Sequence, residues 1–257
     1  MKNQTFIVYF DEAGRWPLAG PVYIGLICPL QKISKKELEI FRDSKQLSES
    51  IRERHFQVIQ DLQECGKILT TPARATAAEI DNYGMTNVLH LSILRGMILI
   101  FGKLYPHYFK NFQNFTLPTP LSTKLNSRNF IKYSDILSSF SNLNNDWIKI
   151  KLVLDGNRDF WLKRMFPFWD FETIISWDDK VKEISMASIV AKVSRDRIME
   201  KLPKKYNKYN FPKHKWYGTK EHKDLIKNHW PSDIHRKLFL KWIFPNHQIQ
   251  KKLPSKF

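Results

Sequence analysis

The sequence contains few carboxylates, and several of them stand directly after short apolar runs. Asp11 and Glu12 follow TFIVYF, Asp155 follows IKIKLVL, and the Asp178–Asp179 pair follows a short apolar run that starts at residue 171. Clustered carboxylates repel one another unless cations neutralise them, and their hard oxygen ligands suit Mg²⁺ or Mn²⁺. Two such ions can activate a water and stabilise the leaving oxygen of a phosphodiester, which is nuclease chemistry. Acids at strand ends are also ordinary loop residues, and the carboxylates alone favour neither interpretation.

One geometric condition applies to the first two acids. Successive side chains of a regular strand point to opposite faces of a sheet. Asp11 and Glu12 can therefore share a site only if the backbone turns between them.

The elements that would position these acids alternate between strands and helices. Residues 5–10 and 22–28 are β-branched and aromatic and are separated by Pro and Gly, which predicts a hairpin. Ser50 opens a capping box, so we expect a helix over about residues 49–64. The other predicted elements are helices at 86–104 and from about 186 to 202, strands at 148–154 and 171–176, and a helical, basic region from residue 219. Interleaved strands and helices predict an α/β fold with a mixed sheet.

Residues 105–146 have no clear period and resemble an insertion. Phe109, Phe112 and Phe115 alternate there with lysines and could line a nucleic-acid surface, but a partly ordered surface loop is the favoured interpretation.

The charge balance favours a polyanionic partner. Lys and Arg number 42 against 25 Asp and Glu, a formal net charge of +17. Such an excess favours nucleic acid through counterion release and electrostatic steering, although solubility alone can also explain it. Cys28 and Cys65 stand apart, which argues against a zinc site or a disulfide framework. No stretch suggests a signal peptide or a membrane span, so we expect a cytoplasmic protein.

Six blocks, in order, carry a family resemblance. They are DEAGRWPLAGPV from Asp11, DSKQL from Asp43, DGN from Asp155, ISMASIVAKV from Ile184, YGTKEH from Tyr217 and IHR from Ile234. Together they resemble the ribonuclease HII family. The resemblance reaches from residue 5 to about residue 240 and leaves only the 105–146 insertion and the tail unmatched.

The resemblance implies a ribonuclease H-like fold, with a mixed central sheet flanked by helices and a helical C-terminal part. We expect a catalytic domain at residues 1–205, with the 105–146 insertion, and a substrate-binding segment with a basic tail at 206–257. The implied metal ligands for two Mg²⁺ or Mn²⁺ ions are Asp11, Glu12, Asp155 and Asp178. Asp178 is preferred to Asp179 because it lies seven residues before Ser185. Asp196 is expected to pair with Lys192 on one helix.

The resemblance also implies how substrate is recognised. The backbone of Gly14, Arg15 and Trp16 would contact a ribose 2′-hydroxyl, which distinguishes RNA from DNA, and Tyr217 would pack on that sugar. Ser44 and Lys45 would hold a backbone phosphate. The implied reaction is two-metal hydrolysis of the RNA strand of an RNA–DNA hybrid, or cleavage 5′ of a ribonucleotide embedded in duplex DNA, leaving a 3′-hydroxyl and a 5′-phosphate.

There are two rival interpretations, one a near relative and the other a protein of a different class. Ribonuclease HIII shares the fold but usually carries an extra N-terminal domain, and the catalytic motif here begins within a dozen residues. A nucleic-acid-binding descendant that no longer cleaves is the other alternative, and the four retained carboxylates argue against it. We expect a monomer. Residues 250–253 with Phe257 resemble part of a sliding-clamp-binding peptide, although a plain basic tail is favoured.

Tryptophan stands where glycine is expected at four motif positions: Trp16, Trp177, Trp216 and Trp230. Trp230 follows a basic helix and precedes Pro231, where a left-handed glycine usually ends a helix. The chain holds 9 Gly and 8 Trp, a low and a high count respectively. A UGA codon that some bacteria read as glycine would explain all four positions. We therefore predict glycine there in the natural protein, with four further candidates at Trp147, Trp161, Trp169 and Trp242; true tryptophans that stack on bases are the alternative.

Overall fold

The core of the protein is a mixed sheet of five strands in the order β3-β2-β1-β4-β5. This computed structural model describes residues 4–42, 44, 47–109, 133–145, 147–155, 162–174, 181–202 and 205–244. The strands are β1 (Gln4–Ala13), β2 (Val22–Pro29), β3 (Ile68–Ala75), β4 (Ile148–Asp155) and β5 (Asp170–Ile174). β1, β2 and β3 pair antiparallel, whereas β4 lies parallel to both β1 and β5.

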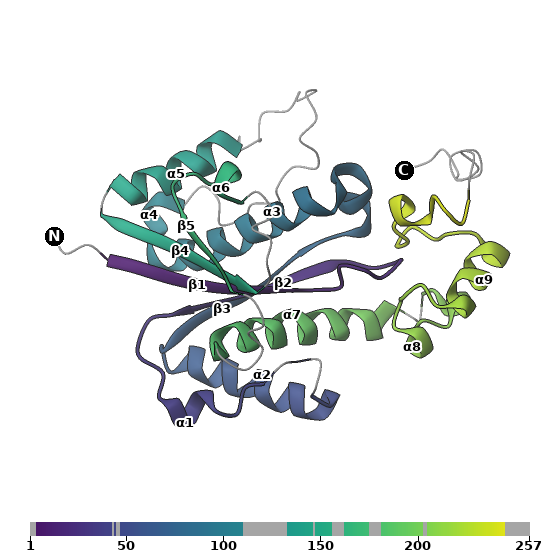
Figure 1. The fold of residues 1–257 in the computed structure, drawn as a ribbon, viewed down its shortest axis with the longest axis horizontal. Coiled ribbons are helices and arrows are strands. Elements are labelled where there is room, and N and C mark those ends of the chain that lie inside the picture. Colours follow the sequence, from purple (N-terminus) through teal and green to yellow (C-terminus); the bar gives the residue numbers. More distant parts are fainter. Residues whose placement is uncertain are drawn as a thin grey trace.

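Helices cover both faces of this sheet (Figure 1). On one face lie α3 (Ala77–Leu104), α4 (Pro106–Phe109), α5 (Tyr133–Asn145) and α6 (Leu162–Met165). On the other face lie α1 (Lys35–Leu38), α2 (Glu49–Glu64) and α7 (Lys182–Lys201). Each face buries its own apolar cluster. β2 is buried on both faces, since Ile24 and Leu26 belong to one cluster and Ile27 to the other.

The C-terminal segment lies at one end of the sheet, beyond the end of α7 (Figure 1). It contains η3 (Asn207–Tyr209), α8 (Phe211–His214), α9 (Lys220–His229) and η4 (Lys237–Leu240). A third apolar cluster joins this segment to Leu18 and Ala19 of the β1–β2 connection and to Met199 of α7. The C-terminal segment therefore packs directly against the chain that follows β1.

The structure confirms most of the predicted elements and corrects several boundaries. α2 is capped by Ser48, whose side chain accepts a hydrogen bond from the Ile51 amide, and not by Ser50. α3 begins at Ala77 instead of residue 86, with a capping box at Thr76 and non-helical backbone at Gly84. β3 was not predicted, because ILTTPARA lacks clean alternation and contains a proline; it is an edge strand, where proline is tolerated.

The predicted insertion is not a surface loop throughout. Residues 133–145 form α5, in which Ile136, Phe140 and Leu143 are buried in the main core. Phe109 is also buried and packs on Phe140 with ring centroids 4.7 Å apart, so it is unavailable to nucleic acid. Phe112 and Phe115 lie outside the described residues.

α3 has the length and apolar composition of a membrane-crossing helix, although no such stretch was expected from the sequence. Within the described ranges it is the one helix that passes this test, and 61% of its apolar window is buried inside the fold. It packs against β2, β3 and α4, as a core helix does.

Candidate active site

Two of the predicted carboxylates, Asp11 and Asp155, are neighbours on adjacent parallel strands. The β1–β4 register pairs Phe10 with Leu154, and each acid is the next residue along its strand. Neighbouring strands lie about 4.8 Å apart, and residues at equivalent positions point to the same face. The parallel pairing therefore places Asp11 and Asp155 side by side at the carboxyl edge of the sheet.

The face on which these two acids lie is the one covered by α7. Gly25 of β2 is the register partner of Asp11. A Cβ atom on Gly25 would lie 2.1 Å from the carbonyl oxygen of Ala187 in α7. Glycine at this position lets α7 approach the sheet directly beside Asp11.

Glu12 leaves the sheet on the opposite face. β1 continues as a regular strand to Ala13, with Glu12 paired to Ile24, so the backbone turn that a shared site would need does not occur. Arg15 Nη1 donates a hydrogen bond to Glu12 Oε1 at 3.5 Å. The structure thus brings Asp11 and Asp155 together and places Glu12 on the other side of the strand.

The fourth predicted ligand, Asp178, lies outside the described residues, as does Asp179. α7 begins at Lys182 and covers the sheet face that carries Asp11 and Asp155. Among the residues that the structure does describe, no group of three or more His, Cys, Asp or Glu side chains is arranged to hold a metal ion.

The predicted ribose-binding residues lie together beside this edge. Gly14, Arg15 and Trp16 follow β1 directly, and the Leu18 amide donates to the carbonyl of Trp216 at 2.9 Å. This bond puts Tyr217 next to the loop, with 45% of its surface exposed. Trp16 is 73% exposed, and the Arg15 guanidinium lies over its ring.

Gly14 is required by its backbone and by its neighbour. Its φ is +87°, which side chains other than glycine rarely adopt. A Cβ atom there would lie 2.1 Å from Arg195 Nε of α7. The loop therefore rests directly on a buried arginine.

Ser44 is buried, and its hydroxyl lies 2.7 Å from the hydroxyl of Ser188 in α7. Arg52 of α2 donates to the carbonyls of Ser44 and Leu47. These contacts hold the connection between α1 and α2 against α7. Lys45, the predicted phosphate-binding partner, lies outside the described residues.

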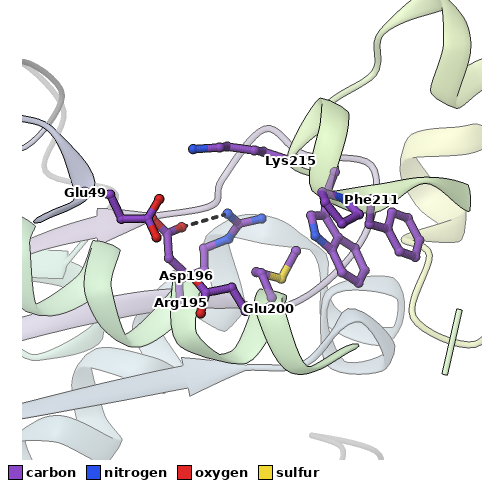
Figure 2. A pocket seen from close by; sticks show the side chains of 9 residues that line it. Glu49, Arg195, Asp196, Glu200, Phe211 and Lys215 are labelled. Carbon is purple, nitrogen blue, oxygen red and sulfur yellow. Dashed lines mark ion pairs between the residues drawn. The ribbon is translucent and has the colours of Figure 1, made fainter. Parts of the chain in front are cut away.

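A pocket of about 270 Å³ lies near the end of α7, and neither Asp11 nor Asp155 lines it (Figure 2). Its lining includes Arg195 and Asp196 of α7, Phe211 and Lys215 of the C-terminal segment, and Glu49 of α2. Asp196 pairs with Lys192 at 2.8 Å, which confirms the predicted ion pair within α7. Burial lowers the pKa of Lys192, and the Asp196 carboxylate opposes this shift.

Two arginines have roles that the sequence did not reveal. Arg236 belongs to a recognised motif block and Arg195 follows another, but no function was attached to either. Both are buried beneath the Gly14–Trp16 loop. Burial lowers the pKa of Arg236 to about 9, and the positive charge of Arg195 adds to this effect. Arg195 stands between Ser194 and Asp196, and Arg236 between His235 and Lys237, so their neighbours in the sequence carried no signal of burial.

Solved ribonuclease H structures share this arrangement of strands and helices. Ribonuclease H2 from Pyrococcus horikoshii OT3 matches with a TM-score of 0.56 at 20% identity, over 96% of this chain and 99% of that one. A chain of the PCNA:RNase HII complex from Archaeoglobus fulgidus matches with a TM-score of 0.53 at 15% identity, over 98% of this chain and all of that one. At such identities the likeness shows the fold, which is that of ribonuclease H.

Sequence comparison narrows this class to one family. The ribonuclease HII family model matches residues 124–242. Ribonuclease HII from Aliarcobacter butzleri is 32% identical over 239 residues, 93% of this chain and 91% of the relative. The relative from Campylobacter hominis is 32% identical over 229 residues, 89% of this chain and 91% of its own length. The chain therefore belongs to the ribonuclease HII family and is a ribonuclease H endonuclease of type II.

Proposed function

We propose that this protein hydrolyses the RNA strand of RNA–DNA hybrids and cuts 5′ of ribonucleotides embedded in duplex DNA, by a two-metal mechanism. The observation that carries the proposal is the placement of Asp11 and Asp155 side by side, three residues from an exposed loop that Tyr217 adjoins. A carboxylate pair and a sugar-binding surface then lie at one edge of the sheet.

The carboxylates fit divalent ions by their donor chemistry. Asp11 and Asp155 present hard oxygen ligands on one face of two adjacent strands, and both are only partly buried. With Asp178 they would hold two Mg²⁺ or Mn²⁺ ions. Bound ions of this kind stabilise the negative charge that develops when a phosphodiester is hydrolysed.

The loop fits recognition of a ribose by backbone groups. Glycine at position 14 permits a close approach, because it has no Cβ atom. Tyr217 presents an exposed ring beside the loop, against which a sugar can pack. The 2′-hydroxyl is a donor and an acceptor that only RNA provides, so amides at this place would select ribonucleotides.

The proposed reaction is balanced by one water molecule. Its oxygen attacks the phosphorus on the 5′ side of the ribonucleotide, and the bond from phosphorus to the 3′ oxygen of the preceding nucleotide breaks. The proton of the water ends on that leaving oxygen. The products are a 3′-hydroxyl and a 5′-phosphate.

Single-turnover cleavage of a DNA duplex that contains one ribonucleotide tests the proposal. With Mg²⁺ or Mn²⁺ we expect a cut directly 5′ of the ribonucleotide, and with EDTA or with an all-DNA duplex we expect none. An RNA–DNA hybrid of the same sequence measures the second activity. Tight binding of these duplexes without cleavage under any metal condition would instead favour the non-cleaving descendant.

We further propose that the tail binds a sliding clamp. The support is limited to residues 250–253 with Phe257, which lie outside the described residues, and to the Archaeoglobus fulgidus structure, which is a PCNA:RNase HII complex. Deletion of residues 248–257 should abolish capture by an immobilised clamp and leave cleavage of free duplex unchanged. Equal capture of both chains would contradict this proposal.

A further inference from the structure

Arg236 is completely buried, and its guanidinium donates hydrogen bonds to the loop of residues 14–20 and lies over the Phe239 ring. Nε donates to the carbonyl of Gly20 at 2.9 Å, and Nη2 donates to the carbonyl of Gly14 at 2.6 Å. Nη1 donates to the carbonyls of Arg15 and Pro17, each at 2.9 Å. One planar side chain thus satisfies four carbonyls of residues 14–20, which no other side chain could do, since arginine alone carries five donors in a fixed fork.

These contacts fix which way the loop amides point. In a planar trans peptide, the carbonyl oxygen and the following N–H point in opposite directions. The carbonyls of Gly14 and Arg15 point to Arg236, so the N–H groups of Arg15 and Trp16 point away from it. Those two amides belong to the loop proposed to contact the ribose.

Arg236 is itself held by the rest of the protein. Its amide donates to the carbonyl of Leu18, and the Gly20 amide donates to the carbonyl of Ile234. Both carboxylate oxygens of Asp81 in α3 accept from the amides of Lys237 and Leu238 at 2.9 Å. The guanidinium therefore has a fixed position relative to the sheet that carries Asp11 and Asp155.

Burying this cation is unfavourable for the fold. Within the described residues its side chain donates to neutral carbonyls, and Arg195, a second buried cation, lies beneath Gly14. The Asp81 carboxylate opposes the effect of burial on the pKa of Arg236 but does not reverse it. A buried charge without a bonded counter-charge costs stability. A buried arginine at this position is explained if the orientation of the loop matters to the reaction.

We propose that Arg236 is a positioning residue for ribose selection: it orients the Arg15 and Trp16 amides toward the 2′-hydroxyl by holding the loop carbonyls behind them. This rests on the proposed function, because it assumes that the loop recognises the ribose. Arg236 itself does not touch the substrate. Its loss should therefore reduce discrimination between ribonucleotide and deoxyribonucleotide more than it reduces affinity for a duplex.

The test compares Arg236→Lys with the wild type in two measurements. The first is the ratio of dissociation constants for an all-DNA duplex and for the same duplex with one ribonucleotide, measured in Ca²⁺. The second is single-turnover cleavage in Mg²⁺. Lysine keeps the charge but has a single donor atom, so it cannot span four carbonyls. We expect the binding ratio to fall at least about tenfold, which is the loss of one well-formed hydrogen bond to the 2′-hydroxyl.

Arg197→Met is the matched control, because Arg197 pairs with Glu53 in an exposed ion pair on the same helix as Arg195. It should keep the wild-type ratio. A folded Arg236→Lys variant with an unchanged ratio would overturn the proposal. Failure of the wild type itself to distinguish the two duplexes would instead contradict the proposed function, so the two failures are distinguishable.

If Arg236→Lys does not fold, NMR of the wild-type protein decides. The Arg15 and Trp16 amide resonances should shift when a ribonucleotide duplex binds and should shift much less with the all-DNA duplex. The Arg236 Nε proton should be protected from solvent exchange in both complexes. Exchange of that proton at the rate of a free arginine, or equal amide shifts with both duplexes, would overturn the proposal.

Discussion

Asp11 and Asp155 are close because β1 and β4 run parallel in a defined register, and not because either residue has an unusual backbone. Two carboxylates on one face repel one another unless a cation lies between them. Each acid therefore supplies negative charge that binds the cation. Asparagine has the same shape but is neutral, so it cannot replace either acid.

Asp11→Asn and Asp155→Asn should each abolish metal-dependent cleavage and leave duplex affinity within about twofold of the wild type, because basic side chains supply most of that affinity. Single-turnover cleavage and fluorescence anisotropy measure the two effects. Asp135→Asn, in α5 on the surface, is the control and should cleave normally. Near-normal turnover by either catalytic variant would remove that residue from the proposed site.

Tryptophan occupies three positions whose backbone favours glycine. Trp147, Trp216 and Trp230 have φ values of 67°, 72° and 63°. Trp230 combines its positive φ with a ψ of 160°, and this pair of angles is almost exclusive to glycine. Trp230 directly follows α9, at the helix end that the sequence predicted. Trp16, Trp169 and Trp242 do not share a positive φ, and Trp161 and Trp177 lie outside the described residues.

Trp147→Gly should therefore stabilise the protein by about 1 kcal/mol, because it relieves backbone strain of about 1–3 kcal/mol at the cost of some glycine entropy. Trp242→Gly is the matched control: the two side chains are 59% and 58% exposed, but Trp242 has no positive φ. Urea unfolding measures both variants. Destabilisation by Trp147→Gly would contradict the backbone argument.

If the natural protein has glycine at the four motif positions, replacing those tryptophans with glycine should increase activity. A chain with glycine at 16, 177, 216 and 230 should cleave a ribonucleotide-containing duplex faster than the chain as written, since an indole at position 16 crowds the loop that must approach a sugar. The codons of the natural gene decide whether these tryptophans arise from UGA codons that the organism reads as glycine. UGG codons at all four positions would exclude that explanation.

Among the helices, α5 shows how an element without a clear sequence signal can be essential to the core. Its Phe140 is 1% exposed and lies against Phe101, Phe109 and Trp169, with ring centroids 4.7 to 5.9 Å apart. α5 thus covers the face of the sheet that is opposite α7.

Phe140→Ala should lower the free energy of unfolding by about 3–5 kcal/mol, because it leaves a cavity among aromatic rings. Leu99→Ala, at a position that is 46% exposed in α3, should change it by less than about 1 kcal/mol. Urea denaturation compares the two. An effect of Phe140→Ala no larger than that of Leu99→Ala would show that α5 is not docked as described.

For the whole molecule, the C-terminal segment depends on three buried histidines. His222 Nε2 lies 3.2 Å from His235 Nε2, and the His214 ring stacks on His222. Burial lowers the pKa of His222 to about 4 and that of His235 to about 3, and His214 is shifted in the same direction. The Asp233 carboxylate opposes the shift of His235 but does not reverse it.

The folded protein therefore keeps these imidazoles neutral at a pH where the unfolded chain, with pKa values near 6.5, binds protons. Stability should be constant above pH 7 and fall as pH drops from 6.5 to 5, with a slope of up to about 1.4 kcal/mol per pH unit for each histidine. This window lies above the range in which carboxylates titrate. Urea midpoints at pH 7.5, 6.0 and 5.0 measure it, and a midpoint that rises toward pH 5 would contradict it.

The net charge of +17 predicts how binding depends on salt. Each phosphate that a basic side chain neutralises releases a counterion, so the logarithm of affinity should fall linearly with the logarithm of salt concentration. With six or more phosphate contacts, affinity for a duplex should drop about a thousandfold between 50 and 200 mM salt. Binding of Asp11→Asn in EDTA measures this slope without cleavage, and a slope near zero would show that the charge serves another purpose.

The sequence by itself determined the strands that carry Asp11 and Asp155, the helix α2, the Lys192–Asp196 pair and the likeness to ribonuclease HII. These features depend on residues a few positions apart, or on ordered motifs, and a linear pattern records both. The sequence also predicted the left-handed backbone of Trp230 at the end of α9, because the end of a helix depends on residues close together in the sequence.

Only the tertiary structure decided which residues meet across long separations. It placed Glu12 on the face opposite Asp11, buried Phe109 under α5, added β3 at the sheet edge, and brought Arg236 beneath a loop more than two hundred positions earlier in the chain. The spacing of residues along a strand or helix fixes which of them share a face, but it does not specify the partner of that face. That choice depends on packing and hydrogen bonding summed over the whole chain, and the support of the Gly14–Trp16 loop by a buried guanidinium is its result.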